Sequence, residues 1–208
     1  MIPSVARPEP QPVPITLSRL LLTEGVSPMH FCEAILRHID LAPQVEVRSF
    51  GGNTDLATIL KAFAESSEFK ALVTSVGIIR DAEGDAVAAR RLVDAAIENA
   101  NLPDHVRRSV FILPDNVSPG MIETLCMDAV RQHAPLAEAY NCVQSFFTCL
   151  QESGVFVPHP VRGAKNRAQA FLATKADAQM FPGIAAYRGF WPWDSPTFDT
   201  LKQFLRSL

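Results

Sequence analysis

Residues 76–85 of this chain read VGIIRDAEGD. In this stretch an apolar run leads into three acids at every second position, Asp81, Glu83 and Asp85, and then into a turn. Because side chains alternate between the two faces of a β-strand, acids spaced by two on an extended segment point to the same side. We therefore expect a buried strand whose carboxyl end carries converging carboxylates.

Converging carboxylates repel one another, and a hard divalent cation with oxygen ligands is the usual relief. This pattern makes Asp81, Glu83 and Asp85 candidate ligands of Mg²⁺ or Mn²⁺. A second interpretation stays open, because acids after a strand also solvate loops and cap helices. Asp85 in particular could cap the helix that follows Gly84.

Strand and helix patterns alternate along the chain as far as residue 134. Apolar runs predict four strands, at residues 17–23, 45–50, 72–80 and 110–113. Helical spacing of apolar residues predicts helices that begin at Ser27-Pro28, span 56–63 and 89–96, and begin again at Ser118-Pro119. This order indicates an α/β fold with a parallel-rich sheet flanked by helices on both faces.

The two ends of the chain differ from this core, residues 17–134. Residues 135–208 predict helices at 137–150, at 163–174 and after Ser195-Pro196, which we interpret as a C-terminal extension packed on the core. Residues 1–16 form a proline-rich leader, and proline is excluded from helix interiors and central strands. We expect an extended arm there that could join the protein to a second copy or to a partner protein.

Composition excludes several classes of protein. The 208 residues are 48% hydrophobic and 20% charged with a net charge of −3, unlike a basic protein that coats nucleic acid. Four cysteines without metal-binding spacing predict buried thiols in a reducing cytoplasm. We find neither an apolar run long enough for a membrane span nor a signal peptide. Glycine-rich phosphate loops and serine-hydrolase elbows are also missing from the sequence.

Acidic residues also follow two other predicted strands. Glu24-Gly25 comes directly after the first strand, and Asp115 comes shortly after the fourth. In open parallel sheets, functional residues gather in the crevice outside the carboxyl ends of the strands. We therefore expect Glu24 to lie near Asp81 and Glu83. Asp115 and Glu123 also fit ordinary turn and helix-start roles.

These residues carry a resemblance to a known domain. Glu24-Gly25 and Asp81-Ala82-Glu83 resemble the two signatures of the Toprim domain, which topoisomerases, bacterial primases and overcoming-lysogenization-defect nucleases share. The chain is most similar to small stand-alone Toprim-related bacterial proteins of unassigned function. The further matching motifs are Gly51-Gly52, the stretch from Leu113 to Glu123, and Lys165 followed by Phe171-Leu172-Ala173.

The resemblance implies a Mg²⁺-dependent enzyme that cleaves phosphodiesters or transfers phosphoryl groups, most often a nuclease acting on nucleic acid. It implies metal ligation by Asp81 and Glu83, with Asp85 as a further acid, proton transfer by Glu24 and phosphate binding by Lys165. The chain departs from the pattern at Glu83, where an Asp is usual, and at 26–28, where relatives often carry acids. An inactive Toprim-like module that binds nucleic acid or a partner protein therefore stays open.

Overall fold

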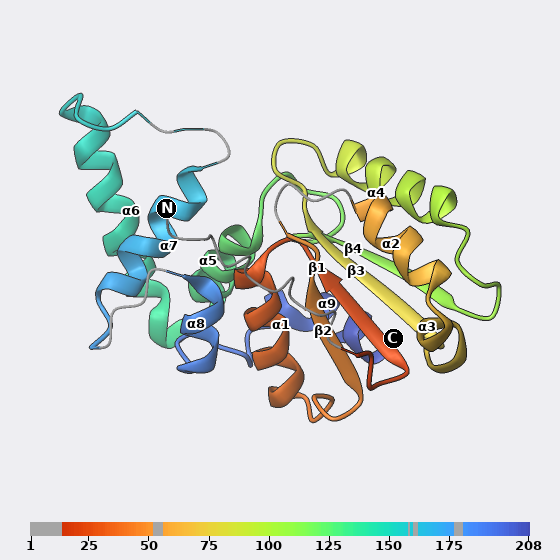
Figure 1. The fold of residues 1–208 in the computed structure, drawn as a ribbon. Helices are drawn as coiled ribbons and strands as arrows, with labels where there is room; N and C mark the ends of the chain where they lie inside the picture. The colour runs from red at the N-terminus through yellow and green to blue at the C-terminus, as the bar shows by residue number, and fades with distance from the viewer. Residues whose placement is uncertain (1–13, 52–55, 158, 160–161, 177–180) are drawn as a thin grey trace, which may run out of the picture.

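The computed structural model describes residues 14–51, 56–157, 159, 162–176 and 181–208. Its centre is a four-stranded parallel sheet in the order β2-β1-β3-β4 (Figure 1). The strands are β1 (Arg19–Thr23), β2 (Val45–Ser49), β3 (Ser75–Asp81) and β4 (Arg107–Leu113). The two central strands, β1 and β3, are buried along most of their length, whereas β2 and the first half of β4 are more exposed. The predicted α/β class is confirmed.

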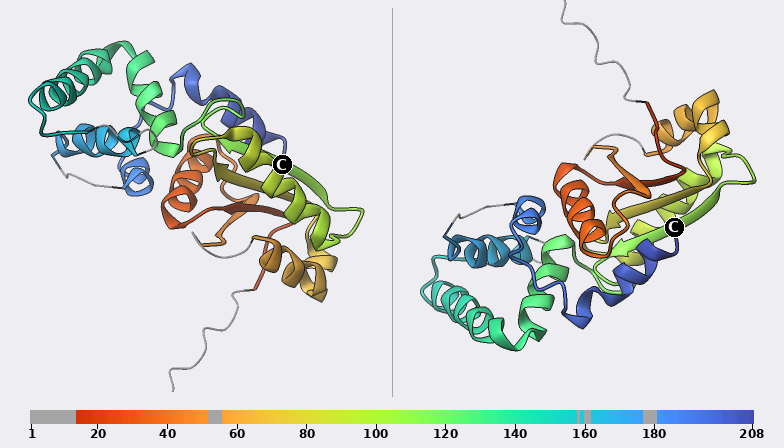
Figure 2. Two further views of the ribbon diagram at one scale, coloured as in Figure 1. Left: turned by 90° about the horizontal axis from the view of Figure 1, so that it is seen from above. Right: turned by 90° about the horizontal axis from the view of Figure 1, so that it is seen from below.

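Helices cover both faces of the sheet, each over its own apolar core (Figures 1 and 2). One face is covered by α1 (Val26–His38), α5 (Ile122–Gln132) and α9 (Asp199–Arg206). The other is covered by α2 (Leu56–Glu65), α3 (Ser67–Leu72) and α4 (Ala86–Ala100). Strand alternation divides the side chains between them, so that Ile79 enters the first core and Ile78 the second.

The C-terminal extension lies at one end of the molecule, beyond α1 and α5 (Figure 2). It comprises α6 (Ala137–Glu152), α7 (Gly163–Ala173) and α8 (Pro182–Tyr187), with short 3₁₀ turns at Ala134–Leu136 and Pro196–Phe198. The chain then returns to the sheet through α9, and the buried side chain of Leu208 packs over Gly77 of β3. The extension therefore completes one core of the sheet.

Several helix boundaries differ from the sequence prediction. The N-cap of α1 is Gly25, with φ of 92°, and Ser27 instead accepts a hydrogen bond from Gly183 N at 3.2 Å. The start of α5 is Ile122 rather than Ser118, because Asp115 accepts hydrogen bonds from the backbone N–H groups of Val117 and Ser118. The carboxylate of Asp115 holds a turn that delays the helix.

Two short helices, α3 and α8, were not predicted from the sequence. Leu92, one of the apolar residues whose spacing predicted the helix at 89–96, has 59% of its surface exposed on α4. Cys32 and Cys126 are buried as expected, but Cys142 and Cys149 are exposed on α6, and all four thiols are free. Within the described residues, no helix has the length and apolar character needed to cross a bilayer.

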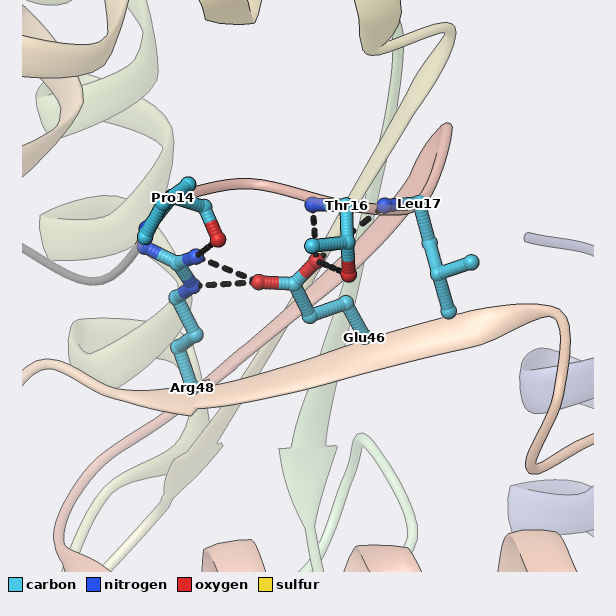
Figure 3. A network of polar contacts seen from close by, with 5 residues as sticks. All are labelled: Pro14, Thr16, Leu17, Glu46 and Arg48. Carbon is cyan, nitrogen blue, oxygen red and sulfur yellow. Dashed lines mark hydrogen bonds and ion pairs between the residues drawn. The ribbon is translucent and has the colours of Figure 1, made fainter.

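The described chain begins with a segment that is fixed to β2 (Figure 3). The carboxylate of Glu46 accepts hydrogen bonds from Thr16 N at 2.7 Å and Leu17 N at 3.1 Å, while an Arg48 N–H donates to Pro14 O at 2.7 Å. Ile15 is buried in the core beneath α2 and α4. The predictions for the leader through Val13 and for the turn at Gly52 lie outside the described residues.

Candidate active site

The carboxyl ends of β1 and β3 form the crevice where ligands are expected. From β1 the chain continues through α1 to β2, whereas β3 is reached through α2 and α3 on the opposite face of the sheet. Such a reversal of strand order opens a crevice that open α/β sheets use for binding. Glu24 N donates to Ile79 O at 3.3 Å, and Gly25 then turns the chain away. Strand pairing therefore places Glu24 at this crevice.

Asp81, the last residue of β3, is the central carboxylate of the site. Burial raises its pKa to about 7, and the nearby carboxylate of Glu123 and, more weakly, that of Glu24 add to the rise. A hydrogen bond from Ile122 N at 3.1 Å and the charge of Lys165 oppose it. Asp81 thus lies close to two other carboxylates, while Ile122 N and Lys165 offset part of the repulsion.

Glu24 lies beside Arg80, the residue that precedes Asp81 at the end of β3. The distance from Arg80 Nε to Glu24 Oε2 is 3.3 Å, and both side chains are partly buried. Burial raises the pKa of Glu24; the charge of Arg80 opposes this rise and that of Glu83 adds to it. These groups line a cavity of about 300 Å³ bounded on its far side by α4.

Glu123 and Lys165 complete the opposite side of the site. Glu123, in the first turn of α5, is only 5% exposed, and burial raises its pKa. The Nζ atom of Lys165, on α7, lies 4.0 Å from Glu123 Oε1. The sequence indicated only an ordinary helix-start role for Glu123. Its burial depends on packing against α7, which local sequence does not show. The only sequence signal for it was its place at the end of the Leu113–Glu123 motif.

The expected alignment of three acids on one extended segment is wrong beyond Asp81. The strand ends there, and Glu83 adopts a left-handed conformation with φ of 50° while exchanging backbone hydrogen bonds of 2.7 Å with Gly120. Asp85 caps α4, because its Oδ1 accepts hydrogen bonds from Val87 N at 2.9 Å and Ala88 N at 3.0 Å. Capping, the alternative reading of Asp85, is the role that its contacts show.

Seen as a whole, the site holds four acids and two cations around the end of β3. Glu24, Arg80 and Glu83 lie toward α4, and Glu123 and Lys165 lie toward α7, with Asp81 between them. In the described part of the chain, no three His, Cys, Asp or Glu side chains are placed together so that they could hold a metal ion. Any cation held here would therefore use fewer protein ligands.

Asn116 and Trp191 belong to the scaffold of the protein and not to the site. Asn116 accepts a hydrogen bond from Ile112 N at 2.8 Å within the turn after β4. Trp191 is buried, donates its indole N–H to Pro182 O at 2.9 Å and stacks on Phe171. Trp191 is therefore a core residue.

Comparison with known proteins assigns the chain to a family. The sequence model of DUF3226, described as a protein of unknown function, matches residues 18–208. The chain belongs to the DUF3226 family. The DUF3226 match spans the sheet and the C-terminal extension together, so both Glu24 and Lys165 lie within it. No curated protein matches the chain, and no solved structure does.

Proposed function

We propose that this DUF3226 protein is a Mg²⁺-dependent enzyme of the Toprim type that cleaves phosphodiesters or transfers phosphoryl groups, and that it acts as a nuclease. The observation that carries the proposal is the crowding of Glu24, Asp81 and Glu123 at the switch point of the sheet, each with a raised pKa. Folding opposes the ionisation of all three groups, and such clusters are characteristic of functional sites.

The donor groups suit Mg²⁺ or Mn²⁺. Carboxylate oxygens are hard ligands, and proteins commonly bind Mg²⁺ through one or two carboxylates, leaving water and substrate phosphates to complete its coordination. Asp81 together with Glu24 or Glu83 would supply such a set, so a three-residue cage is not required. When bound, the ion would polarise a phosphoryl oxygen and lower the pKa of a bound water.

The neighbouring residues support distinct roles in this proposal. A carboxyl group with a raised pKa, such as Glu24, is suited to proton transfer near neutral pH. Arg80 holds the Glu24 carboxylate in place at 3.3 Å. Lys165 would contribute positive charge toward a phosphate, since it is exposed while its only ion-pair partner among the described residues, Glu123, is buried beneath it.

The test is a cleavage screen on single- and double-stranded DNA and RNA oligonucleotides with Mg²⁺, Mn²⁺ or EDTA. We expect cleavage only with the metal, and we expect Asp81→Asn to lower the rate by about 100-fold or more. Asp85→Asn is the matched control, because it removes the same charge from the same loop and asparagine caps a helix as well as aspartate. It should retain activity. Equal cleavage by wild type and Asp81→Asn would place the chemistry elsewhere.

A catalytically inactive module that binds nucleic acid is the second candidate. The ion pairs Arg80–Glu24 and Lys165–Glu123 favour it, because each occupies a carboxylate that catalysis would use. The missing acids at residues 26–28 favour it as well. This candidate predicts no cleavage and no stabilisation by metal, but salt-sensitive binding of oligonucleotides that weakens in Lys165→Gln.

A further inference from the structure

A second cavity, of about 420 Å³, lies between the end of α1, the end of α5 and the loop that joins α8 to α9. It is remote from the carboxylates, because α1 runs away from the carboxyl ends of the strands and the cavity lies at its last residue. Five of the ten residues that line it carry aromatic rings, and charged groups lie among them. The residues that matter are His38, Lys175, Phe190, Trp191, Trp193 and Asp194.

The aromatic wall is held rigid by ring contacts from behind. Trp193 lies 6.0 Å from the His38 ring at an interplanar angle of 27° and packs edge-on against Phe31. Trp191 stacks on Phe171, and the Nζ of Lys175 lies 4.3 Å from the centre of that ring. A preformed apolar cavity with a few polar groups is typical of a binding site.

Aromatic-lined grooves of this kind bind proline-rich segments in the polyproline II conformation. Such a segment is present in the same chain, since residues 7–12 read RPEPQP. Proline fixes φ, so less conformational entropy is lost on docking. The segment also carries one charge of each sign, Arg7 and Glu9, which complement Asp194 and Lys175 at the cavity.

The point where this segment joins the fold decides which cavity it can reach. Pro14 O is held by Arg48, and Ile15 is buried in the core beneath α2 and α4 (Figure 3). The cavity belongs to the opposite face of the sheet, where α1, α5 and the C-terminal helices pack. A segment docking in its own cavity would have to pass around the edge strand β2 and across α1.

We propose that the proline-rich arm, residues 7–12, docks in the aromatic cavity of a second copy of this chain. Only Val13 lies between Pro12 and Pro14, so the segment leaves the fold close to its anchor on β2, and the polyproline II conformation advances about 3.1 Å per residue. Docking in the cavity of a second copy does not require this path around β2 and across α1. Reciprocal docking of two arms gives a closed twofold dimer.

Trp191 and Trp193 are the only tryptophans of the chain, so intrinsic fluorescence reports directly on the cavity. We expect the 208-residue chain to form a dimer that dissociates on dilution, with sedimentation and tryptophan emission changing at the same concentration. A synthetic peptide of residues 1–14 should compete with the arms, converting dimer to monomer while keeping the emission of the docked state.

Three variants of the whole chain test the arm and the wall. Replacing Pro8, Pro10 and Pro12 together with alanine should weaken the dimer by about tenfold or more, because a flexible arm loses more entropy on docking. Phe190→Ala in the wall should weaken it similarly. Phe181→Ala is the matched control, because this exposed phenylalanine does not line the cavity and should leave the dimer unchanged.

Three results would overturn the proposal. The first is a chain that stays monomeric at every attainable concentration, even if the peptide changes its emission, because the second copy would then play no part. The second is a dimer that neither the peptide nor the triple alanine variant affects. The third is a dimer whose dissociation leaves the tryptophan emission constant, since the cavity would then lie outside the interface.

Discussion

Asp81 is the carboxylate whose environment most strongly opposes its charge. Burial is the largest cause, and the neighbouring Glu123 and Glu24 add to it, raising its pKa to about 7. Because the pKa is higher in the folded than in the unfolded protein, the folded state retains the proton over a range where the unfolded state has lost it. The stability that this group contributes is complete below pH 4 and is lost as pH rises through 7.

The pH dependence of stability tests this directly in the presence of EDTA. Asparagine resembles protonated aspartate in shape and charge, so Asp81→Asn should match wild type below about pH 4. Between about pH 4 and 7 the wild type should become less stable than the variant, by on the order of 1 kcal/mol or more, since each pKa unit is worth about 1.4 kcal/mol. Parallel curves for the two proteins, measured by thermal unfolding, would show that Asp81 ionises as freely as in water.

Metal binding gives a second prediction for the same residue. If Mg²⁺ or Mn²⁺ relieves the repulsion among the carboxylates, it binds the folded state and should raise Tm by mass action. Asp81→Asn should abolish this rise, and Asp85→Asn should retain it, because Asp85 is engaged at the N-terminus of α4. Equal responses from wild type and Asp81→Asn would indicate a metal site at other residues.

For individual residues, the sequence could predict which side chains meet at the ends of neighbouring strands. Glu24 and Asp81 lie at strand ends, and parallel strands bring their ends together, so their approach follows from local pattern. Capping by Asp85 was one of the two roles that the sequence left open, and the choice between them depends on a left-handed Glu83 that breaks the strand. The burial of Glu123 could not be predicted, because it depends on α7, which lies 40 residues further along the chain.

The packing of α8 on α1 is the clearest feature at the scale of elements. Gly183 of α8 lies directly against the backbone carbonyl of Ser27, so a methyl group there would clash with that oxygen and would lie 2.8 Å from His30 Cβ. Because a backbone carbonyl cannot rotate away as a side chain can, the two helices would have to separate. No sequence pattern predicted α8, since six residues are too few to show helical periodicity.

Gly183→Ala should therefore destabilise the protein by about 1–3 kcal/mol, the usual cost of overpacking. Gly84→Ala is the matched control, because no atom lies within 4 Å of its added methyl group. It should change the free energy of unfolding by less than about 0.5 kcal/mol, as surface substitutions do. Urea denaturation of both variants measures the difference, and equal stabilities would mean that α1 and α8 are less closely packed than this structure has them.

At the scale of the whole molecule, Leu208 links the C-terminal extension to the sheet. Leu208 is 1% exposed and packs over Gly77 in the middle of β3, while Arg107 of β4 donates a hydrogen bond to its backbone oxygen. The sequence predicted that the extension packs on the core, but the identity of this contact could not be predicted. It joins residues 131 positions apart, 208 − 77, and no local pattern encodes such a distance.

Leu208→Ala should destabilise the whole protein by about 2–5 kcal/mol, the cost of truncating a buried leucine. Leu92→Ala, the same substitution at a 59% exposed position, should cost little. Both tryptophans lie in the extension, so their fluorescence follows that part, while far-ultraviolet circular dichroism follows all helices. If the extension and the sheet unfold as one unit, both signals must shift together in Leu208→Ala. A shift in circular dichroism alone would instead mean that the part of the extension with the tryptophans folds as a separate unit whose stability does not depend on the sheet.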